Sequence, residues 1–274
     1  LEEAFTQLQA LCNEPGSFGL VSLKNVSSSV VFGIEAALWW LQQTEWLPAP
    51  VNAPLLEGST DVIVQSLKQW GRPWPREFKL KIGSGSLEED RVRICKVLDC
   101  LPESVRLKLD ANQRWTFQQA LCLSHSLERF SVAGRIAYIE EPTGNVDEFP
   151  EFYRCTGIPY ALDETVQSPD YRFSAMPGLV ALILKPTLAG GLSRCQQLIQ
   201  EARHSGVRAI ISSSFESSLG LHVLQQLSAA WTPGELPGLD TVGVFQHNIM
   251  TRIVTRIVSR TPESGQPIEV FSTS

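Results

Sequence analysis

The fold is decided by "SVRLKLDAN" (residues 104–112) and "RIAYIEEP" (135–142), two apolar runs on either side of "TFQQALCLSHSLERF" (116–130). Both runs are short and rich in β-forming residues, whereas the segment between them repeats its apolar side chains at the spacing of a helix. Two strands joined by a helix of this length are typical of a parallel βαβ unit. Each run also reaches a carboxylate near its end, Asp110 in the first and Glu140 in the second.

The same alternation of apolar runs and helical patterns extends along the chain. Two more helical patterns occupy 87–101 and 192–206. The other apolar runs are "APLLEG" (53–58), "EFKLKIG" (77–83), "IPYALDE" (158–164), "LVALILKP" (179–186), "VRAIISSS" (207–214) and "GLDTVGVF" (238–245). Strands that alternate with helices in this way predict an α/β fold, a parallel sheet closed into a (β/α) barrel of modified TIM type. A doubly wound open sheet is the alternative architecture.

The composition limits the class of partner. The chain has 274 residues, 43% of them hydrophobic, which suffices for a sizeable buried core. A formal net charge of −6 and a pI near 5.3 argue against nucleic acid or an anionic membrane as partner. The six cysteines form no C-x-x-C pair, and no apolar run reaches the ~18 residues that a membrane span needs. We therefore expect reduced thiols, a cytoplasmic location and a small-molecule or protein partner.

Polar side chains stand at the ends of nearly all the apolar runs. They are Lys81, Asp110, Glu140 with Glu141, Asp163 with Glu164, Lys185, and Ser212 to Ser214. In a barrel these positions share the C-terminal rim, where active sites of this fold are built. Any one carboxylate could instead be a helix N-cap, and a lysine pair could line a solvated strand edge. Neither alternative applies to Lys185. It directly follows a buried apolar run, so its charge would be buried without a partner unless an active site accommodates it.

These residue types point to one kind of chemistry. Three carboxylates without a neighbouring cysteine or histidine make an all-oxygen site that suits Mg²⁺ or Mn²⁺. Lysines beside such a site suggest proton abstraction next to a substrate carboxylate, with the metal ion and one lysine neutralising the charge that develops. Lys79 lies two residues from Lys81 and on the same strand face, so its ammonium group is expected to lower the pKa of Lys81.

The order of these motifs resembles the enolase superfamily. The motifs are K-x-K (79–81), D-x-N (110–112), E-E-P (140–142), D-E (163–164) and K-P (185–186). Within the superfamily, "ILKPTLAGGL" (183–192) and "ISSSFESSLGL" (211–221) are similar to the o-succinylbenzoate synthase family. The resemblance implies a Mg²⁺-dependent lyase that dehydrates 2-succinyl-6-hydroxy-2,4-cyclohexadiene-1-carboxylate to 2-succinylbenzoate in menaquinone or phylloquinone biosynthesis, with syn loss of water.

The resemblance also implies residue roles and a domain plan. The implied Mg²⁺ ligands are Asp110, Glu140 and Asp163, the implied acid/base is Lys81, and Lys185 faces it across the substrate. Supporting roles fall to Lys79, Asn112 and Glu164, and substrate contacts to Ser212, Ser213 and Gly238. A barrel is expected over 49–245, and a smaller α+β capping domain over 1–48 with 246–274 returning to it. The N-terminal part of that capping domain is expected to be truncated.

Two other functions remain open at this point. A dipeptide epimerase or N-acylamino acid racemase of the same superfamily shares the facing lysines, but epimerases usually carry Asp-x-Asp on the last strand, where this chain has "GLDT" (238–241). A non-catalytic binding barrel would have other residues in place of some of these carboxylates or lysines, and this sequence retains all of them. We expect a monomer that acts on a small carboxylate substrate and binds neither nucleic acid nor membrane.

Overall fold

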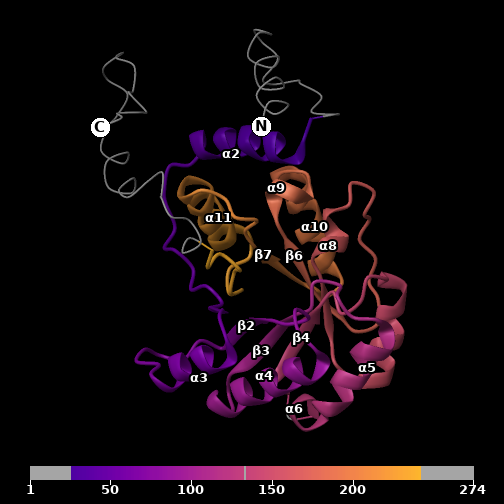
Figure 1. Ribbon diagram of the computed structural model, residues 1–274. Helices are drawn as coiled ribbons and strands as arrows, with labels where there is room; N and C mark the ends of the chain where they lie inside the picture. Colours follow the sequence, from indigo (N-terminus) through magenta and orange to yellow (C-terminus); the bar gives the residue numbers. More distant parts are fainter. Residues whose placement is uncertain (1–25, 133, 242–274) are drawn as a thin grey trace, which may run out of the picture.

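The strands form one parallel sheet in which each strand pairs with the next along the chain (Figure 1). The computed structural model describes residues 26–132 and 134–241. The strands are β1 (Leu55–Leu56), β2 (Glu77–Lys81), β3 (Arg106–Asp110), β4 (Ile136–Glu140), β5 (Tyr160–Leu162), β6 (Leu179–Leu184) and β7 (Arg208–Ile211). A doubly wound sheet would reverse its strand order at a switch point, and this sheet does not. The predicted barrel-type α/β fold is therefore confirmed.

The eighth expected strand (238–245) differs from its prediction. Its residues 242–245 lie outside the described residues, and within the described part it contributes an isolated bridge between Gly238 and Ser212. The amide of Gly238 donates to the carbonyl of Ile211 at 3.0 Å, and the amide of Ala53 donates to the carbonyl of Pro237 at 3.0 Å. This short segment thus joins β7 to the chain just before β1, and the ring of strands closes through it.

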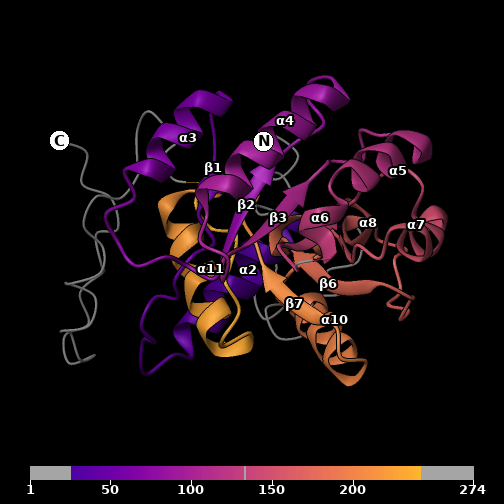
Figure 2. The same cartoon turned by 90° about the horizontal axis from the view of Figure 1, so that it is seen from below.

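Helices surround the strands, as Figure 2 shows from below. They are α2 (Ser28–Leu41), α3 (Thr60–Lys68), α4 (Leu87–Cys100), α5 (Phe117–Ser126), α6 (Glu128–Val132), η2 (Val146–Glu148), α7 (Phe149–Thr156), α8 (Glu164–Gln167), α9 (Pro186–Ala189), α10 (Leu192–His204) and α11 (Ser218–Trp231). Two of the predicted helices begin with capping boxes, Ser86 with Glu89 before α4 and Thr116 with Gln119 before α5. None of the helices in the described part of the chain is long and apolar enough to cross a membrane.

Side-chain alternation separates the barrel interior from the layer between strands and helices. Tyr138, Ala161, Ile183 and Ile210 share one small buried cluster, while two larger clusters pack the opposite faces of the strands against the helices. Each of these four residues stands two positions before a predicted site residue, and residues two apart in a strand point the same way. The predicted site residues therefore belong to the interior face.

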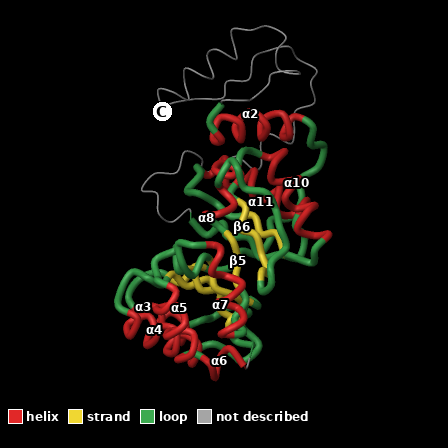
Figure 3. Tube along the Cα trace, turned by 90° about the vertical axis from the view of Figure 1, so that its right-hand side faces the viewer, coloured by secondary structure: helices red, strands yellow, loops and turns green. Residues whose placement is uncertain are grey.

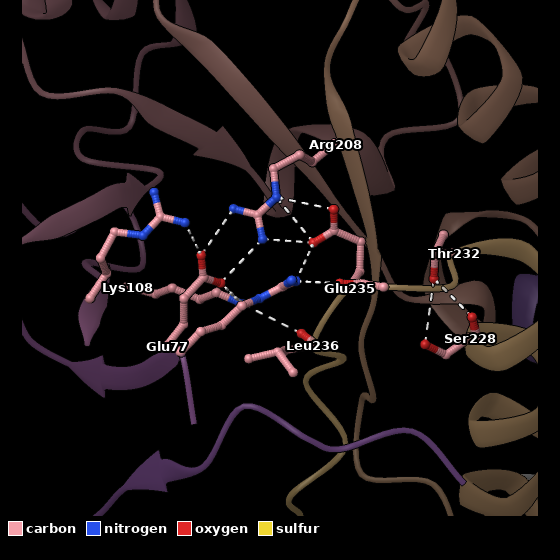
Figure 4. A network of polar contacts seen from close by, with 10 residues as sticks. Glu77, Lys108, Arg208, Ser228, Thr232, Glu235 and Leu236 are labelled. Carbon is pink, nitrogen blue, oxygen red and sulfur yellow. Dashed lines mark hydrogen bonds and ion pairs between the residues drawn. The ribbon is translucent and has the colours of Figure 1, made fainter. Parts of the chain in front are cut away.

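The amino-terminal end of the barrel holds a buried ion network (Figure 4). The carboxylate of Glu77, from the start of β2, lies 3.1 Å from the ammonium of Lys108 on β3 and 3.1 Å from the guanidinium of Arg208 on β7. Arg208 also binds Glu235 at 2.6 Å. Burial alone would raise the pKa of Glu77, but the charges of Lys108 and Arg208 outweigh it and lower the pKa to about 2.

This network predicts a large loss of stability when Glu77 is replaced by glutamine. The change would leave Lys108, which is 2% exposed, and the neighbouring Arg208 without their shared carboxylate. We expect the free energy of unfolding at neutral pH to fall by about 3–5 kcal/mol, measured by denaturant titration. The contribution of Glu77 to the free energy of unfolding is fully present above its ordinary pKa of 4.5. It is lost as the pH falls toward the lowered pKa of about 2. The difference between wild type and variant should therefore shrink over that interval.

The matched control is Glu88→Gln on α4. Glu88 is exposed and, within the described residues, its ion pair is with Arg91 of its own helix, so its replacement should change stability far less. Equal losses from the two variants, or a difference that does not change with pH, would show that the interior network does not stabilise the barrel.

Helix α2 lies across the ends of α10 and α11, away from α3 to α7 (Figure 3). Its Glu35 carboxylate accepts hydrogen bonds from the amides of Leu192 and Ser193 in the first turn of α10 and from the Ser193 hydroxyl at 2.5 Å. An acidic group at this place satisfies helix donors that otherwise lack partners. The predicted domain boundaries stay a prediction, because 1–25 and 246–274 lie outside the described residues. Five cysteines, all in the described part, carry free thiols as expected.

Candidate active site

The predicted site residues meet at the carboxyl end of the barrel. Lys81 lies opposite Asp110 in the register of β2 and β3, and Asp110 lies opposite Glu140 in the register of β3 and β4. Asp163 directly follows β5, and Lys185 directly follows β6. Because parallel strands all end at the same edge, residues far apart in sequence are brought together there. The three carboxylates are buried, with at most 2% of each residue exposed.

Two of the lysines bind these carboxylates directly. The ammonium nitrogen of Lys79 lies 2.8 Å from Oδ2 of Asp110 and 2.6 Å from Oε2 of Glu140. The ammonium nitrogen of Lys185 lies 2.6 Å from Oδ2 of Asp163. These pairs modify the expected role of Lys79: two carboxylates offset most of its charge, which weakens any repulsion that it exerts on Lys81.

The electrostatics of the cluster follow from its burial. Burial raises the pKa of Glu140, and the charges of Asp110 and Asp163 add to the effect against the opposing charge of Lys79, so the pKa is about 7. Burial alone would lower the pKa of Lys79, but the carboxylates of Glu140 and Asp110 raise it well above its ordinary value. The buried carboxylates therefore depend on the positive charges of Lys79 and Lys185 beside them.

A cavity of about 400 Å³ opens beside these groups. Most of the predicted site residues line it, namely Lys79, Lys81, Asp110, Asn112, Glu164, Lys185, Ser212, Ser213 and Gly238. Glu140 and Asp163 do not line the cavity, and they contact it through Lys79 and Lys185. Both candidate catalytic lysines thus face one space that is large enough for a small organic acid.

The supporting residues form contacts of their own around this cavity. The side-chain amide of Asn112 donates to Oε1 of Glu164 at 3.2 Å, which links the loops after β3 and β5. The hydroxyl of Ser212 donates to the carbonyl of Gly238 at 3.1 Å, and the hydroxyl of Ser213 lies 2.7 Å from that of Thr241. The predicted substrate contacts of these serines stay a prediction.

The sequence did not indicate the backbone strain of this region or several of the residues that line its cavity. Asn112, Gln113, Glu141 and Phe215 all have left-handed backbone conformations, with φ between 42° and 66°, although none of them is glycine. All four lie in loops that follow strands at the carboxyl end of the barrel, where backbone strain commonly marks functional sites. Glu57, Leu188, Phe215, Asp240 and Thr241 also line the cavity. The E-E pair at 140–141 was the only signal in the sequence that could have identified Glu141.

The donor set suits a hard divalent cation. Asp110, Glu140 and Asp163 stand at the ends of three neighbouring strands and offer only oxygen, which Mg²⁺ prefers. Among the described residues, no three His, Cys, Asp or Glu side chains are arranged closely enough to hold a metal ion as they stand. Lys79 and Lys185 instead supply positive charge to the carboxylates. The oxygen-only chemistry of the three donors nevertheless fits a cation at this place.

Comparison with known proteins identifies relatives over most of the chain. The family model described as enolase C-terminal domain-like matches residues 63–257. An o-succinylbenzoate synthase of Pectobacterium atrosepticum is 38% identical over 248 residues, which cover 89% of this chain and 72% of that protein. An o-succinylbenzoate synthase of Yersinia pseudotuberculosis is 40% identical over 233 residues, covering 85% of this chain and 71% of that protein.

Solved structures share the fold. The o-succinylbenzoate synthase from Thermosynechococcus elongatus BP-1, complexed with Mg in its active site, aligns with a TM-score of 0.64 and 24% identity, covering 84% of this chain and 73% of that chain. A dipeptide epimerase from Cytophaga hutchinsonii aligns with a TM-score of 0.65 and 19% identity, covering 82% of this chain and 64% of that one. At these identities the structural likeness establishes the fold and leaves the substrate open.

Proposed function

The chain belongs to the enolase superfamily, among the relatives of the o-succinylbenzoate synthases, and from that premise we propose the reaction that it catalyses. The proposed reaction removes water from 2-succinyl-6-hydroxy-2,4-cyclohexadiene-1-carboxylate and yields 2-succinylbenzoate, a step of menaquinone or phylloquinone biosynthesis. The observation that carries the proposal is a cavity lined by Lys81, Lys185 and the buried Asp110. The buried Glu140 and Asp163 lie behind it, bound to Lys79 and Lys185.

Lys81 is the proposed acid and base. Its neutral amine takes the proton from the ring carbon that bears the carboxylate, and the electron pair left behind moves into the carboxylate to give an enediolate. When the adjacent hydroxyl leaves from the same face, the resulting ammonium of Lys81 returns the proton to it, so that one water molecule departs and the ring becomes aromatic. Lys185 exchanges no proton in this scheme, and its ammonium group stabilises the charge of the enediolate.

Asp110, Glu140 and Asp163 are the residues that would hold Mg²⁺. When bound, the ion supplies positive charge against the substrate carboxylate as negative charge develops there. Lys79 is proposed to keep Asp110 and Glu140 in place through its two ion pairs, which measure 2.8 and 2.6 Å. The hydroxyls of Ser212 and Ser213 are proposed to bind the other carboxylate of the substrate.

The proposal predicts turnover of the cyclohexadiene that depends on Mg²⁺. The purified chain should form 2-succinylbenzoate in the presence of Mg²⁺, lose this activity in excess EDTA, and regain it when Mg²⁺ is restored. Without the ion, its positive charge no longer offsets the charge that develops on the substrate carboxylate. Product formation can be followed by nuclear magnetic resonance. Dipeptides and N-acyl amino acids serve as the comparison substrates. Racemisation of these without conversion of the cyclohexadiene would assign the chain to the epimerases or racemases instead.

A further inference from the structure

Glu141 is a buried carboxylate that none of the steps above uses. It directly follows Glu140 and has no exposed surface. Its Oε1 accepts hydrogen bonds from the amides of Asp163 at 2.8 Å and Thr165 at 2.9 Å. Its Oε2 accepts from the hydroxyl of Thr165 at 3.0 Å and from the side-chain amide of Gln113 at 3.0 Å. Four donors therefore converge on one side chain, two on each oxygen.

The four donors come from the segments after β3 and β5, which also carry other site residues. Gln113 belongs to the loop after β3, next to Asn112, while Asp163 and Thr165 belong to the segment after β5. The backbone of Glu141 contacts the same two segments. Its carbonyl accepts a hydrogen bond from the amide of Gln113 at 2.9 Å, and its amide donates to the carbonyl of Ala161 at 3.1 Å. Glu141 thus ties the ends of β3, β4 and β5 together.

The chemistry of the contacts favours a carboxylate at this position, because only a carboxylate accepts from all four donors as they stand. The backbone amides of Asp163 and Thr165 can only donate, so a glutamine there must turn its oxygen toward them, and its nitrogen then requires the Thr165 hydroxyl and the Gln113 side chain to accept instead of donate. The left-handed backbone of Glu141, with φ of 42°, is strained for a residue other than glycine, and the surrounding hydrogen bonds hold it there.

We propose that Glu141 is a positioning residue for the cation and for Lys185, acting through the backbone of Asp163. The hydrogen bond to the Asp163 amide sets the main chain from which that carboxylate extends, and Oδ2 of Asp163 in turn binds Lys185 at 2.6 Å. Gln167 binds the other carboxylate oxygen of Asp163 at 3.1 Å, so the side chain is held from both sides. This inference rests on the proposed function for its reaction, while its metal readout does not depend on turnover.

The test is the affinity of the Glu141→Gln variant for Mg²⁺, measured by calorimetric titration without substrate. Partners that orient metal ligands typically change metal affinity by about 10- to 100-fold when mutated, so the dissociation constant should rise by that range. With substrate at saturating Mg²⁺, kcat should fall by more than KM rises, because Lys185 would be displaced from the reacting centre while the cavity remains.

Two further variants make the result specific. Glu148→Gln is the matched control, because Glu148 ends the helix η2 in the same segment after β4 and its carboxylate accepts the Thr143 hydroxyl at 2.7 Å, so Mg²⁺ affinity should be unchanged. Thr165→Val removes one of the four donors and leaves the carboxylate in place. It should weaken Mg²⁺ binding by less than Glu141→Gln does, and it keeps the test decisive if the glutamine variant does not fold.

The outcomes separate this inference from the proposed function. Wild-type Mg²⁺ affinity in a folded Glu141→Gln variant, or in Thr165→Val where the glutamine variant is unfolded, would overturn the positioning role. A wild-type chain that binds no Mg²⁺ would overturn it as well. If the wild type binds Mg²⁺, the variant binds it weakly, and neither converts the cyclohexadiene, then the positioning role stands and the proposed reaction is wrong.

Discussion

Replacing Lys81 by alanine should reduce turnover of the cyclohexadiene by at least about 10²- to 10⁴-fold, the usual contribution of a positioned general acid or base. Under the proposed mechanism Lys81 both takes the proton and returns it to the departing hydroxyl, so its loss removes two proton transfers at once. Substrate and Mg²⁺ affinity should be largely kept, because Asp110, Glu140 and Asp163 remain. The measurements are kcat from product formation and the Mg²⁺ dissociation constant from calorimetry.

Lys96→Ala on α4 is the control for removing a lysine. Its side chain is 54% exposed, and its nearest carboxylate partner is Asp61 at 3.7 Å, so its replacement should leave kcat unchanged. Near-wild-type turnover in a folded Lys81→Ala variant would remove Lys81 from the chemistry and require another base in the cavity.

Replacing Lys185 by alanine should lower kcat by about 10²- to 10³-fold for a different reason, the loss of a charge that stabilises the enediolate. The variant should bind Mg²⁺ at least as well as the wild type, because Oδ2 of Asp163 would lose the ammonium group that lies 2.6 Å away. Turnover and metal affinity are therefore expected to change independently, which calorimetry and product formation can measure on the same sample.

Arginine variants distinguish the two lysines. Arginine keeps its positive charge at all accessible pH values and cannot act as a base. Lys185→Arg should therefore recover part of the activity that Lys185→Ala loses, whereas Lys81→Arg should be as inactive as Lys81→Ala. Recovery by Lys81→Arg, or equal activities of Lys185→Arg and Lys185→Ala, would contradict the proposed division of roles.

The strands and the site edge could be predicted from the sequence because both depend on local periodicity. The run "LVALIL" is apolar at every position, as a strand covered on both faces must be, and Lys185 follows it at once. The same pattern placed Lys81, Asp110, Glu140 and Asp163 at strand ends. Parallel strands joined by helices can only bring such ends to one edge, so the shared cavity followed from the order of the elements.

Only the tertiary structure decided which of these groups bind one another. Lys79 was expected to act on Lys81, yet it pairs with Asp110 on β3 and Glu140 on β4. Glu141 carried no separate signal, although four donors from two other loops converge on it. The closing of the ring also depended on a contact between distant segments, the hydrogen bond from the Ala53 amide to the Pro237 carbonyl. Periodicity specifies which face a side chain occupies, whereas hydrogen bonds and ion pairs between strands depend on register and on loop conformation, which are set only when the whole barrel packs.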